Sequence, residues 1–483
     1  MFVLGLILIA VAALPAQQSS TPDPIEGRWL GDAGFPTDRV AIGFEIKRNV
    51  AGVLKAYLFQ PVMNFYGLEL PGPVTRDGDK YTNDDYRLSV TRKGDTLEGT
   101  YFPLNAPITL KRVTTLPSEV PVPALPPGPG PRWQKKLGGA IYAPAATRSG
   151  VAYVATTSGL LFAVKVADGA IAWTFNAGQA LYGEPLATDD AVYVVCDNGY
   201  LFKIDRATGK EAWRYDLGDA RSARVQMHAE ITEFDMDVKA PKPVIADGVI
   251  FVGAGDGGFH AIDAAGKRVW RVDLGGKVRA TALIDGGRVI AGSWSGDVFA
   301  LDRATGKEVW KKPTGAQVTS SPAIAAGQLI VGNRGGLLAA LDPATSKTTW
   351  RMLFWGSSVE SDPVPDAERF FVGSSDLRRI SAIRASDSGV LWRADIYGLA
   401  WARPLVTETT IFASALGVSP YQMRHLGGLS ALDKATGATL WRWPMPEWPG
   451  SMINGFAAGP ALDGGIVIVG GVDGTLYAFP ARQ

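Results

Sequence analysis

The stretch IAGSWSGDVFALDRATGKEVW, residues 290–310, returns along the chain in altered copies, and most copies end on a tryptophan. YVVCDNGYLFKIDRATGKEAW (193–213) and IVGNRGGLLAALDPATSKTTW (330–350) are two of these copies. A fixed period of about 40 residues identifies a repeat architecture before any single residue is considered. The tryptophans that mark the period are Trp133, Trp173, Trp213, Trp270, Trp310, Trp350, Trp392 and Trp441.

Each copy reads as a set of short β-strands. Two apolar, alternating strands flank a glycine-containing turn, and a D-x-x-T-G turn then leads into the strand that carries the tryptophan. In a turn such as Asp302 to Gly306, the aspartate accepts backbone N–H groups and the glycine takes the left-handed conformation. Four short strands repeated in this way predict an all-β fold, a β-propeller.

The two ends of the repeat region predict the number of blades. The segment around Trp133 is a tryptophan strand with no unit before it, and the C-terminal run GGIVIVGGVDGTLYAFP (464–480) lacks its tryptophan strand. Joining the two pieces gives eight blades and a closed ring with no open sheet edge. We expect the eight tryptophans to be structural, each burying roughly 150–250 Å² between neighbouring blades.

Two further segments precede the repeats. Residues 25–113 alternate like strands, and IEGRWLGD (25–32), DTLEGTYF (95–102) and APITLKRV (106–113) resemble the small lipocalin-like β domain in front of many exported bacterial proteins. We therefore expect a small antiparallel β-barrel-like domain there. Residues 114–131 are dense in proline, which predicts a semi-rigid linker to the propeller at 132–483.

The N-terminus predicts export. Residues 1–16 form an apolar run of signal-peptide length that ends on the small residue Ala16. We expect a protein of the periplasm or outer-membrane periphery of a Gram-negative bacterium, with no transmembrane span after signal removal. Because the run lacks the usual positive charge at its start, an uncleaved anchor remains an alternative.

Composition excludes several classes of function. Lys and Arg number 48 against 47 Asp and Glu, and no basic run appears, so nucleic-acid binding is disfavoured. The single cysteine, Cys196, permits no intrachain disulfide and no cysteine-based zinc site. Its place in an apolar run predicts a small buried strand residue.

The repeats LDRATGKEVW (301–310) and LDKATGATLW (432–441) resemble the tryptophan-docking repeat of the PQQ-like propeller superfamily. That superfamily includes pyrroloquinoline-quinone (PQQ) alcohol dehydrogenases and BamB-type outer-membrane assembly factors, so the resemblance implies the fold and leaves two functions open. One cysteine cannot form the adjacent-cysteine disulfide of many such dehydrogenases, most blades have the minimal length, and no C-x-x-C-H haem motif is present. We therefore expect an exported non-catalytic binding or scaffold propeller with no cofactor and no catalytic residue. The alternative is a reduced oxidoreductase for alcohols or sugars that uses PQQ and Ca²⁺.

Candidate ligand-binding residues lie at the start of the innermost strand of each blade, next to the central channel. Opposite charges at one channel mouth suit a polar ligand or a metal with oxygen ligands, but the same residues can also bond to each other and to channel water. No dedicated metal site is expected. The residues are Tyr142, Glu184, His228, Arg279, Ser320, Glu360, Asp362, Arg403 and Asn454.

Two insertions interrupt the period, at residues 221–243 and 417–428. The first mixes acidic and apolar side chains on a predicted loop, which suits contact with a partner or a lid over the channel. The second carries Tyr421, Met423 and His425, and simple loop filler is the alternative for both insertions. We expect a monomer that binds a protein of the cell envelope. The candidate partner-binding residues are Met227, Glu230, Phe234, Asp235, Tyr421 and Met423.

Overall fold

The computed structural model describes residues 22–35, 38–101, 105–119, 121–218, 224, 237–355, 357–418, 425–446 and 451–482. The described residues form β-strands and one short 3-10 helix, η1 (Pro61–Met63). The chain divides into two compact units, one taking most of the residues up to Pro117 and the other the chain from Ser118. Residues 1–16, where a signal peptide is predicted, lie outside the described residues.

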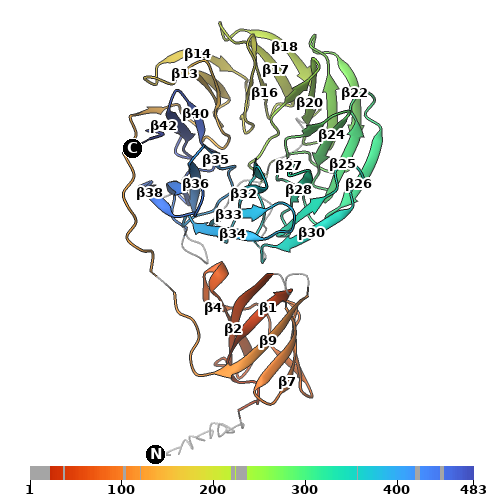
Figure 1. The fold of residues 1–483 in the computed structure, drawn as a ribbon, viewed down its shortest axis with the longest axis vertical. Coiled ribbons are helices and arrows are strands. Elements are labelled where there is room, and N and C mark those ends of the chain that lie inside the picture. Colours follow the sequence, from red (N-terminus) through yellow and green to blue (C-terminus); the bar gives the residue numbers. More distant parts are fainter. Residues whose placement is uncertain are drawn as a thin grey trace, which may run out of the picture. The chain divides into compact units, whose positions relative to one another are not determined.

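The N-terminal unit is one curled antiparallel sheet of nine strands in the order β4-β3-β2-β1-β9-β8-β7-β6-β5 (Figure 1). Trp29 lies in its core, where the indole N–H donates to the Ile25 carbonyl at 2.7 Å. The unit is thus the strongly bent sheet that the alternation predicts, while its likeness to lipocalins stays a prediction. The strands are β1 (Gly27–Phe35), β2 (Asp38–Arg48), β3 (Leu54–Gln60), β4 (Phe65–Glu69), β5 (Thr75–Asp77), β6 (Lys80–Asn83), β7 (Leu88–Lys93), β8 (Thr96–Tyr101) and β9 (Ala106–Val113).

The second unit is an eight-bladed β-propeller, as the repeat predicts (Figure 1). Each blade is an antiparallel sheet whose short innermost strand comes first in blades 1 to 7. Blades 1 to 4 consist of β11 (Ala146–Arg148), β12 (Val151–Ala155), β13 (Leu160–Lys165), β14 (Ile171–Asn176); β15 (Leu186–Ala187), β16 (Ala191–Val195), β17 (Tyr200–Asp205), β18 (Glu211–Asp216); β19 (Val244–Ala246), β20 (Val249–Gly253), β21 (Gly258–Ile262), β22 (Arg268–Asp273); and β23 (Leu283–Asp285), β24 (Arg288–Gly292), β25 (Asp297–Asp302), β26 (Glu308–Pro313). Blades 5 to 7 consist of β27 (Ala323–Ala325), β28 (Gln328–Gly332), β29 (Leu337–Leu341), β30 (Thr348–Leu353); β31 (Val364–Asp366), β32 (Arg369–Gly373), β33 (Arg379–Arg384), β34 (Val390–Asp395); and β35 (Leu405–Val406), β36 (Thr410–Val418), β37 (Gly428–Asp433), β38 (Thr439–Pro444), with β39 (Ile453–Gly455) added to β36.

Blade 8 closes the ring by joining the two ends of the repeat region. Its strands are β40 (Ala461–Asp463), β41 (Ile466–Gly470), β42 (Thr475–Pro480) and β10 (Trp133–Lys136). β10 pairs antiparallel with β42, and Trp133 lies opposite Ala478. The predicted count of eight blades and the closing strand at Trp133 are both confirmed.

The repeated tryptophans lie at the interfaces between consecutive blades. The indole N–H of Trp270 in blade 3 donates to the Arg303 carbonyl in the turn of blade 4, at 3.1 Å. Gly306 of the same turn has φ +73°, and a Cβ added to it would lie 2.8 Å from the Trp270 ring. Glycine is therefore needed both for its backbone conformation and for the close approach of the ring. Equivalent bonds to the following blade are made by Trp133, Trp173, Trp213, Trp310 and Trp350.

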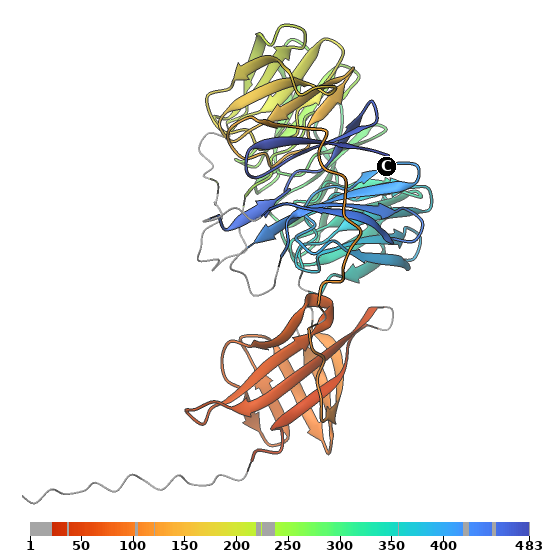
Figure 2. The same cartoon turned by 90° about the vertical axis from the view of Figure 1, so that its left-hand side faces the viewer.

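The proline-rich segment packs against the tryptophan of blade 7. In other blades the glycine of a D-x-x-T-G turn lies against the tryptophan ring of the preceding blade, as Gly437 does against Trp392. Beside Trp441 of blade 7, Pro126 accepts from the Arg442 N–H at 2.9 Å, and the Gly128 N–H donates to the Arg442 carbonyl at 2.8 Å. A Cβ on Gly128 would lie 2.5 Å from the Trp441 ring. Figure 2 shows this part of the chain, in orange, running alongside the blue C-terminal blades.

Replacing Ser346 by glycine is expected to stabilise the propeller by about 0.5–1 kcal/mol. Ser346 occupies the turn position that is glycine in most blades, and its φ of 58° is costly for a residue with a Cβ. Far-UV circular dichroism in urea would measure the change. Ala344→Gly in the same turn is the control and should destabilise, because Ala344 is outside the left-handed region. A loss of stability in Ser346→Gly would contradict the prediction.

Candidate functional site

Five of the predicted ligand-binding residues meet at one mouth of the channel. Tyr142, Glu184, Arg279, Asp362 and Arg403 line a common cavity of about 70 Å³. Each lies in the loop that leads into the innermost strand of its own blade. The five residues meet because these loops converge on the propeller axis. The structure therefore brings together five of the nine predicted residues, from five different blades, and their role in binding a ligand stays a prediction.

The remaining candidates lie elsewhere. Glu360 is buried beside the cavity and accepts from Thr319 at 2.8 Å and from Arg334 at 2.7 Å. Ser320 is fully buried and its hydroxyl donates to the Ser361 carbonyl at 2.8 Å. Asn454 is in β39, opposite Gly417 of β36, and not before an innermost strand. His228 lies outside the described residues.

The end of the first insertion crosses the channel mouth and supplies cations to its carboxylates. Lys242 Nζ lies 2.5 Å from Glu184, which Arg403 also contacts at 3.4 Å. Lys239 Nζ lies 3.9 Å from carboxylate oxygens of both Glu360 and Asp362. Ala240, between the two lysines, bridges to Gly183 of blade 2. The mouth is thus closed by residues 237–243 of the same chain.

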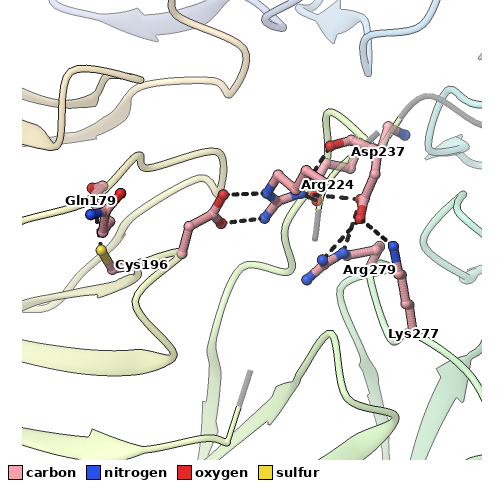
Figure 3. Close-up of polar contacts among 8 residues, drawn as sticks. Gln179, Cys196, Arg224, Asp237, Lys277 and Arg279 are labelled. Atoms are coloured by element: carbon pink, nitrogen blue, oxygen red, sulfur yellow. Dashed lines mark hydrogen bonds and ion pairs between the residues drawn. The ribbon is translucent and has the colours of Figure 1, made fainter. Parts of the chain in front are cut away.

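Asp237 fixes the start of this closing segment (Figure 3). Asp237 as a whole is 1% exposed, and its carboxylate accepts two bonds of 2.9 Å from Arg279, with Arg224 and Lys277 each at 3.1 Å. Arg224 also binds Asp197 through two bonds of 2.5 and 2.6 Å. Burial raises the pKa of Asp237, but the three cations outweigh burial and hold that pKa below its ordinary value.

The same electrostatic balance applies to Glu360. Burial raises the pKa of its carboxyl, while Arg334, Lys239 and the hydroxyl of Thr319 lower it further than burial raises it. Among the described residues, the ion pairs around the mouth join seven cationic side chains to five carboxylates, a net charge of +2. Every one of these carboxylates has a cationic partner among the neighbouring side chains, while ligand binding by the predicted residues stays a prediction.

The mouth does not fit a quinone with its calcium ion. A pocket that encloses an organic ligand measures roughly 300–1,000 Å³, far above the 70 Å³ found here. In the described part of the chain, no three carboxylate, histidine or cysteine side chains are grouped as metal ligands. The carboxylates that calcium would require are already paired with lysine and arginine.

Sequence reasoning missed Arg224, Asp237, Lys239, Lys242 and Lys277 as residues of the mouth. Four of them lie inside the insertion 221–243, where the repeat gives no alignment to place them. The proline-separated run from Lys239 to Pro243 was the available signal, because such a run is extended and can cross a channel. The partner-binding candidates Met227, Glu230, Phe234, Asp235, Tyr421 and Met423 lie outside the described residues.

Cys196 is fully buried directly after β16, as its apolar context predicts. Burial raises the pKa of its thiol, and the sulfur lies 3.2 Å from the Gln179 carbonyl (Figure 3). It therefore has the environment of an inert structural residue. Within the described residues, no helix has the length and the apolar character required to cross a membrane.

Solved structures with the same fold include both kinds of propeller. BamB from Moraxella catarrhalis is 19% identical, with a TM-score of 0.54 over 73% of this chain and 98% of that one. The quinohemoprotein alcohol dehydrogenase from Comamonas testosteroni is 16% identical, with a TM-score of 0.55 over 73% of this chain and 76% of that one. The computationally designed protein Ika8 is 15% identical, with a TM-score of 0.57 over 72% of this chain and 98% of that one. At such identities the likeness shows the fold alone.

The search of curated proteins found no match. A family model described as outer membrane protein assembly factor BamB matches residues 126–232, 220–352, 334–426 and 425–483. These overlapping matches cover the whole propeller, well over half of the chain. The chain therefore belongs to the family described as outer membrane protein assembly factor BamB.

Proposed function

We propose that this protein is an exported, non-catalytic scaffold propeller that binds a partner protein in the cell envelope. The observation that carries the proposal is the channel mouth, where Lys239 and Lys242 from the protein's own insertion occupy the carboxylates of Glu184, Glu360 and Asp362. A site filled in this way has no room for substrate and cofactor. Membership in a family described as an outer membrane assembly factor supports the envelope location.

The partner is proposed to bind the two insertions at 221–243 and 417–428. Arg224 and Asp237, which flank residues 225–236 in the sequence, are held at the mouth by their ion pairs. We also propose cleavage after Ala16, a lipocalin-like domain at 25–113 and a linker at 114–131. The binding partner of the N-terminal unit is then a separate question from that of the propeller.

The second candidate is a quinoprotein oxidoreductase, favoured by the fold shared with a quinohemoprotein alcohol dehydrogenase. That function requires residues 237–243 to leave the mouth. Their departure would break the Lys242–Glu184 pair at 2.5 Å and leave Glu184 and Asp362 available to a cation.

Titration of the full chain with PQQ and Ca²⁺ is expected to show no stoichiometric binding and no dye reduction with alcohols or sugars. Isothermal calorimetry and a dye-reduction assay make the two measurements. The double variant Lys239→Ala and Lys242→Ala removes the lysine partners of Glu184, Glu360 and Asp362. It tests whether these lysines prevent PQQ and Ca²⁺ from binding. Tight quinone binding with turnover by the unaltered chain would overturn the scaffold proposal.

The partner is tested by affinity capture from the native envelope fraction. Residues 225–236 are replaced by a short Gly-Ser linker, which leaves Arg224 and Asp237 in place. The shortened chain should keep its circular dichroism spectrum and lose the captured partner. Retention of the same partner by the folded, shortened chain would exclude this insertion as the binding surface.

A further inference from the structure

In every blade, one strand residue faces the preceding blade close to the tryptophan at the interface between the two blades. It is the residue just before the strand partner of the tryptophan, as Phe299 is next to Ala300, which pairs with Trp310. Large rings fill this position at five interfaces and small side chains occupy it at three. The residues are Phe162, Phe202, His260, Phe299 and Tyr477 on one hand, and Ala339, Ser381 and Ser430 on the other.

At Ala339 the missing ring leaves a cavity of about 540 Å³ between blades 4 and 5. Its apolar lining comes from blade 5, from Val331 in β28 and from Leu337, Ala339 and Leu341 in β29. The β26 end of blade 4, Lys312 to Thr314, forms the opposite side. This volume lies in the range of pockets that enclose a bound group.

The neighbouring blades show what such a position holds when it is filled. Phe202 lies opposite Arg214, and Phe299 lies opposite Lys311. In both pairs the cation lies 5.2 Å from the ring centroid, a cation–π contact. The ring and the cation above it are therefore a recurring unit of the outer part of the blade.

Blade 5 keeps the cation of this unit and lacks the ring. Arg351 lies opposite Ala339, the same register as Arg214 with Phe202, and it is exposed at the cavity rim. Lys312 contributes a second cation from the blade 4 side. Throughout the described residues, neither side chain has an ion pair or a hydrogen bond from its charged group. The rim thus carries two uncompensated positive charges over an apolar floor.

We propose that this cavity binds an aromatic side chain, phenylalanine or tyrosine, from a segment of a partner polypeptide that carries carboxylates beside it. The ring takes the place that Phe202 and Phe299 take in their blades and lies under the Arg351 guanidinium. The flanking carboxylates pair with Arg351 and Lys312. The site lies between blades 4 and 5 and shares no lining residue with the channel mouth, so it stands independently of the proposed function.

Fluorescence anisotropy with a fluorescein-labelled Asp-Gly-Phe-Gly-Asp peptide and the full chain tests the site. We expect saturable binding that weakens at least ~20-fold when the peptide phenylalanine is replaced by alanine, since the ring supplies the buried surface. Ala339→Phe fills the cavity with the repeat's own ring and should weaken binding by a similar factor while the melting temperature holds or rises. Arg351→Ala should weaken binding roughly 3- to 10-fold. Arg214→Ala, the same position in blade 2, is the matched control and should bind normally.

A charge reversal keeps the test decisive if Ala339→Phe does not fold. Arg351→Glu changes an exposed residue, so it should fold, and it should bind the Asp-flanked peptide weakly and a Lys-Gly-Phe-Gly-Lys peptide more tightly than the unaltered chain does. Absence of saturable binding overturns the proposal, as does full affinity in folded Ala339→Phe. Equal affinity for N-acetyl-phenylalanine amide and for the peptide would also overturn the proposal, because the residues that flank the ring would then contribute nothing to the affinity.

Discussion

Replacing Asp237 by asparagine is expected to lower the free energy of unfolding of the propeller by about 3–5 kcal/mol. The substitution keeps the size of the side chain and removes the one charge shared by Arg224, Lys277 and Arg279. Arg279 is 2% exposed, so water cannot replace the lost partner. The cost comes from removing the negative charge beside the buried Arg279 guanidinium, rather than from the hydrogen bonds themselves.

The effect should depend on pH in a defined direction. The pKa of Asp237 is lower in the folded protein than its ordinary value of 3.8, so its charge stabilises the fold above that value. This contribution is lost as the pH falls below about 4 and through the folded-state pKa. The difference between the unaltered chain and Asp237→Asn should therefore be full at pH 7 and shrink in acid.

Urea unfolding at pH 7 and in acid, followed by circular dichroism, measures both effects. Asp189→Asn is the control, because Asp189 pairs with Arg148 on the surface with 87% of its side chain exposed. An exposed pair contributes about 0–1 kcal/mol, so this variant should be nearly neutral. Equal losses in the two variants would show that Asp237 has no special role in holding the closing segment.

The architecture of the propeller was predictable because its signal is repeated. Each blade carries its own tryptophan, and the two incomplete ends at Trp133 and at residues 464–480 complement each other. Blade 5 has Ser346 where most blades have glycine in the turn, but comparison with the other blades still identifies this segment as the same turn. Five of the loops that lead into innermost strands were also located from the sequence, since the period fixes where each of these blades begins.

The pairing at the channel mouth was not predictable from the same pattern. Lys239 and Lys242 belong to an insertion with no counterpart in other blades, so no register connects them to Glu184 or Glu360. Asn454 was misplaced for a related reason. The segment before blade 8 adds β39 to β36, and a single sequence does not reveal this extra pairing.

The cavity at Ala339 could have been found from the sequence. Aligning IVGNRGGLLAALDPATSKTTW with IAGSWSGDVFALDRATGKEVW places Ala339 under Phe299. The blades share most of this strand, and the cavity arises at a position where one blade differs from the others. A deviation inside a conserved strand changes the interface between blades, while a deviation inside a loop changes only the surface.

Replacing Trp270 by alanine is expected to lower the free energy of unfolding by about 3–5 kcal/mol, the range for removing a buried aromatic side chain. The ring is 9% exposed and packs between blades 3 and 4, with Phe251 and Phe259 at centroid distances of 5.8 and 6.0 Å. Gly306 closes the other side of the ring and cannot move inward, because its backbone belongs to the turn of blade 4. The cavity left by alanine would therefore persist, which places the cost near the upper end of the range.

Trp270→Phe separates packing from hydrogen bonding in the same place. It keeps an aromatic ring and removes the donor to the Arg303 carbonyl at 3.1 Å, so a loss of about 1–2 kcal/mol is expected. Urea unfolding followed by far-UV circular dichroism ranks the variants without relying on tryptophan fluorescence. If alanine costs no more than phenylalanine, blades 3 and 4 must be held together by their strand cores alone. The repeated tryptophan would then be a marker of the period that contributes little to stability.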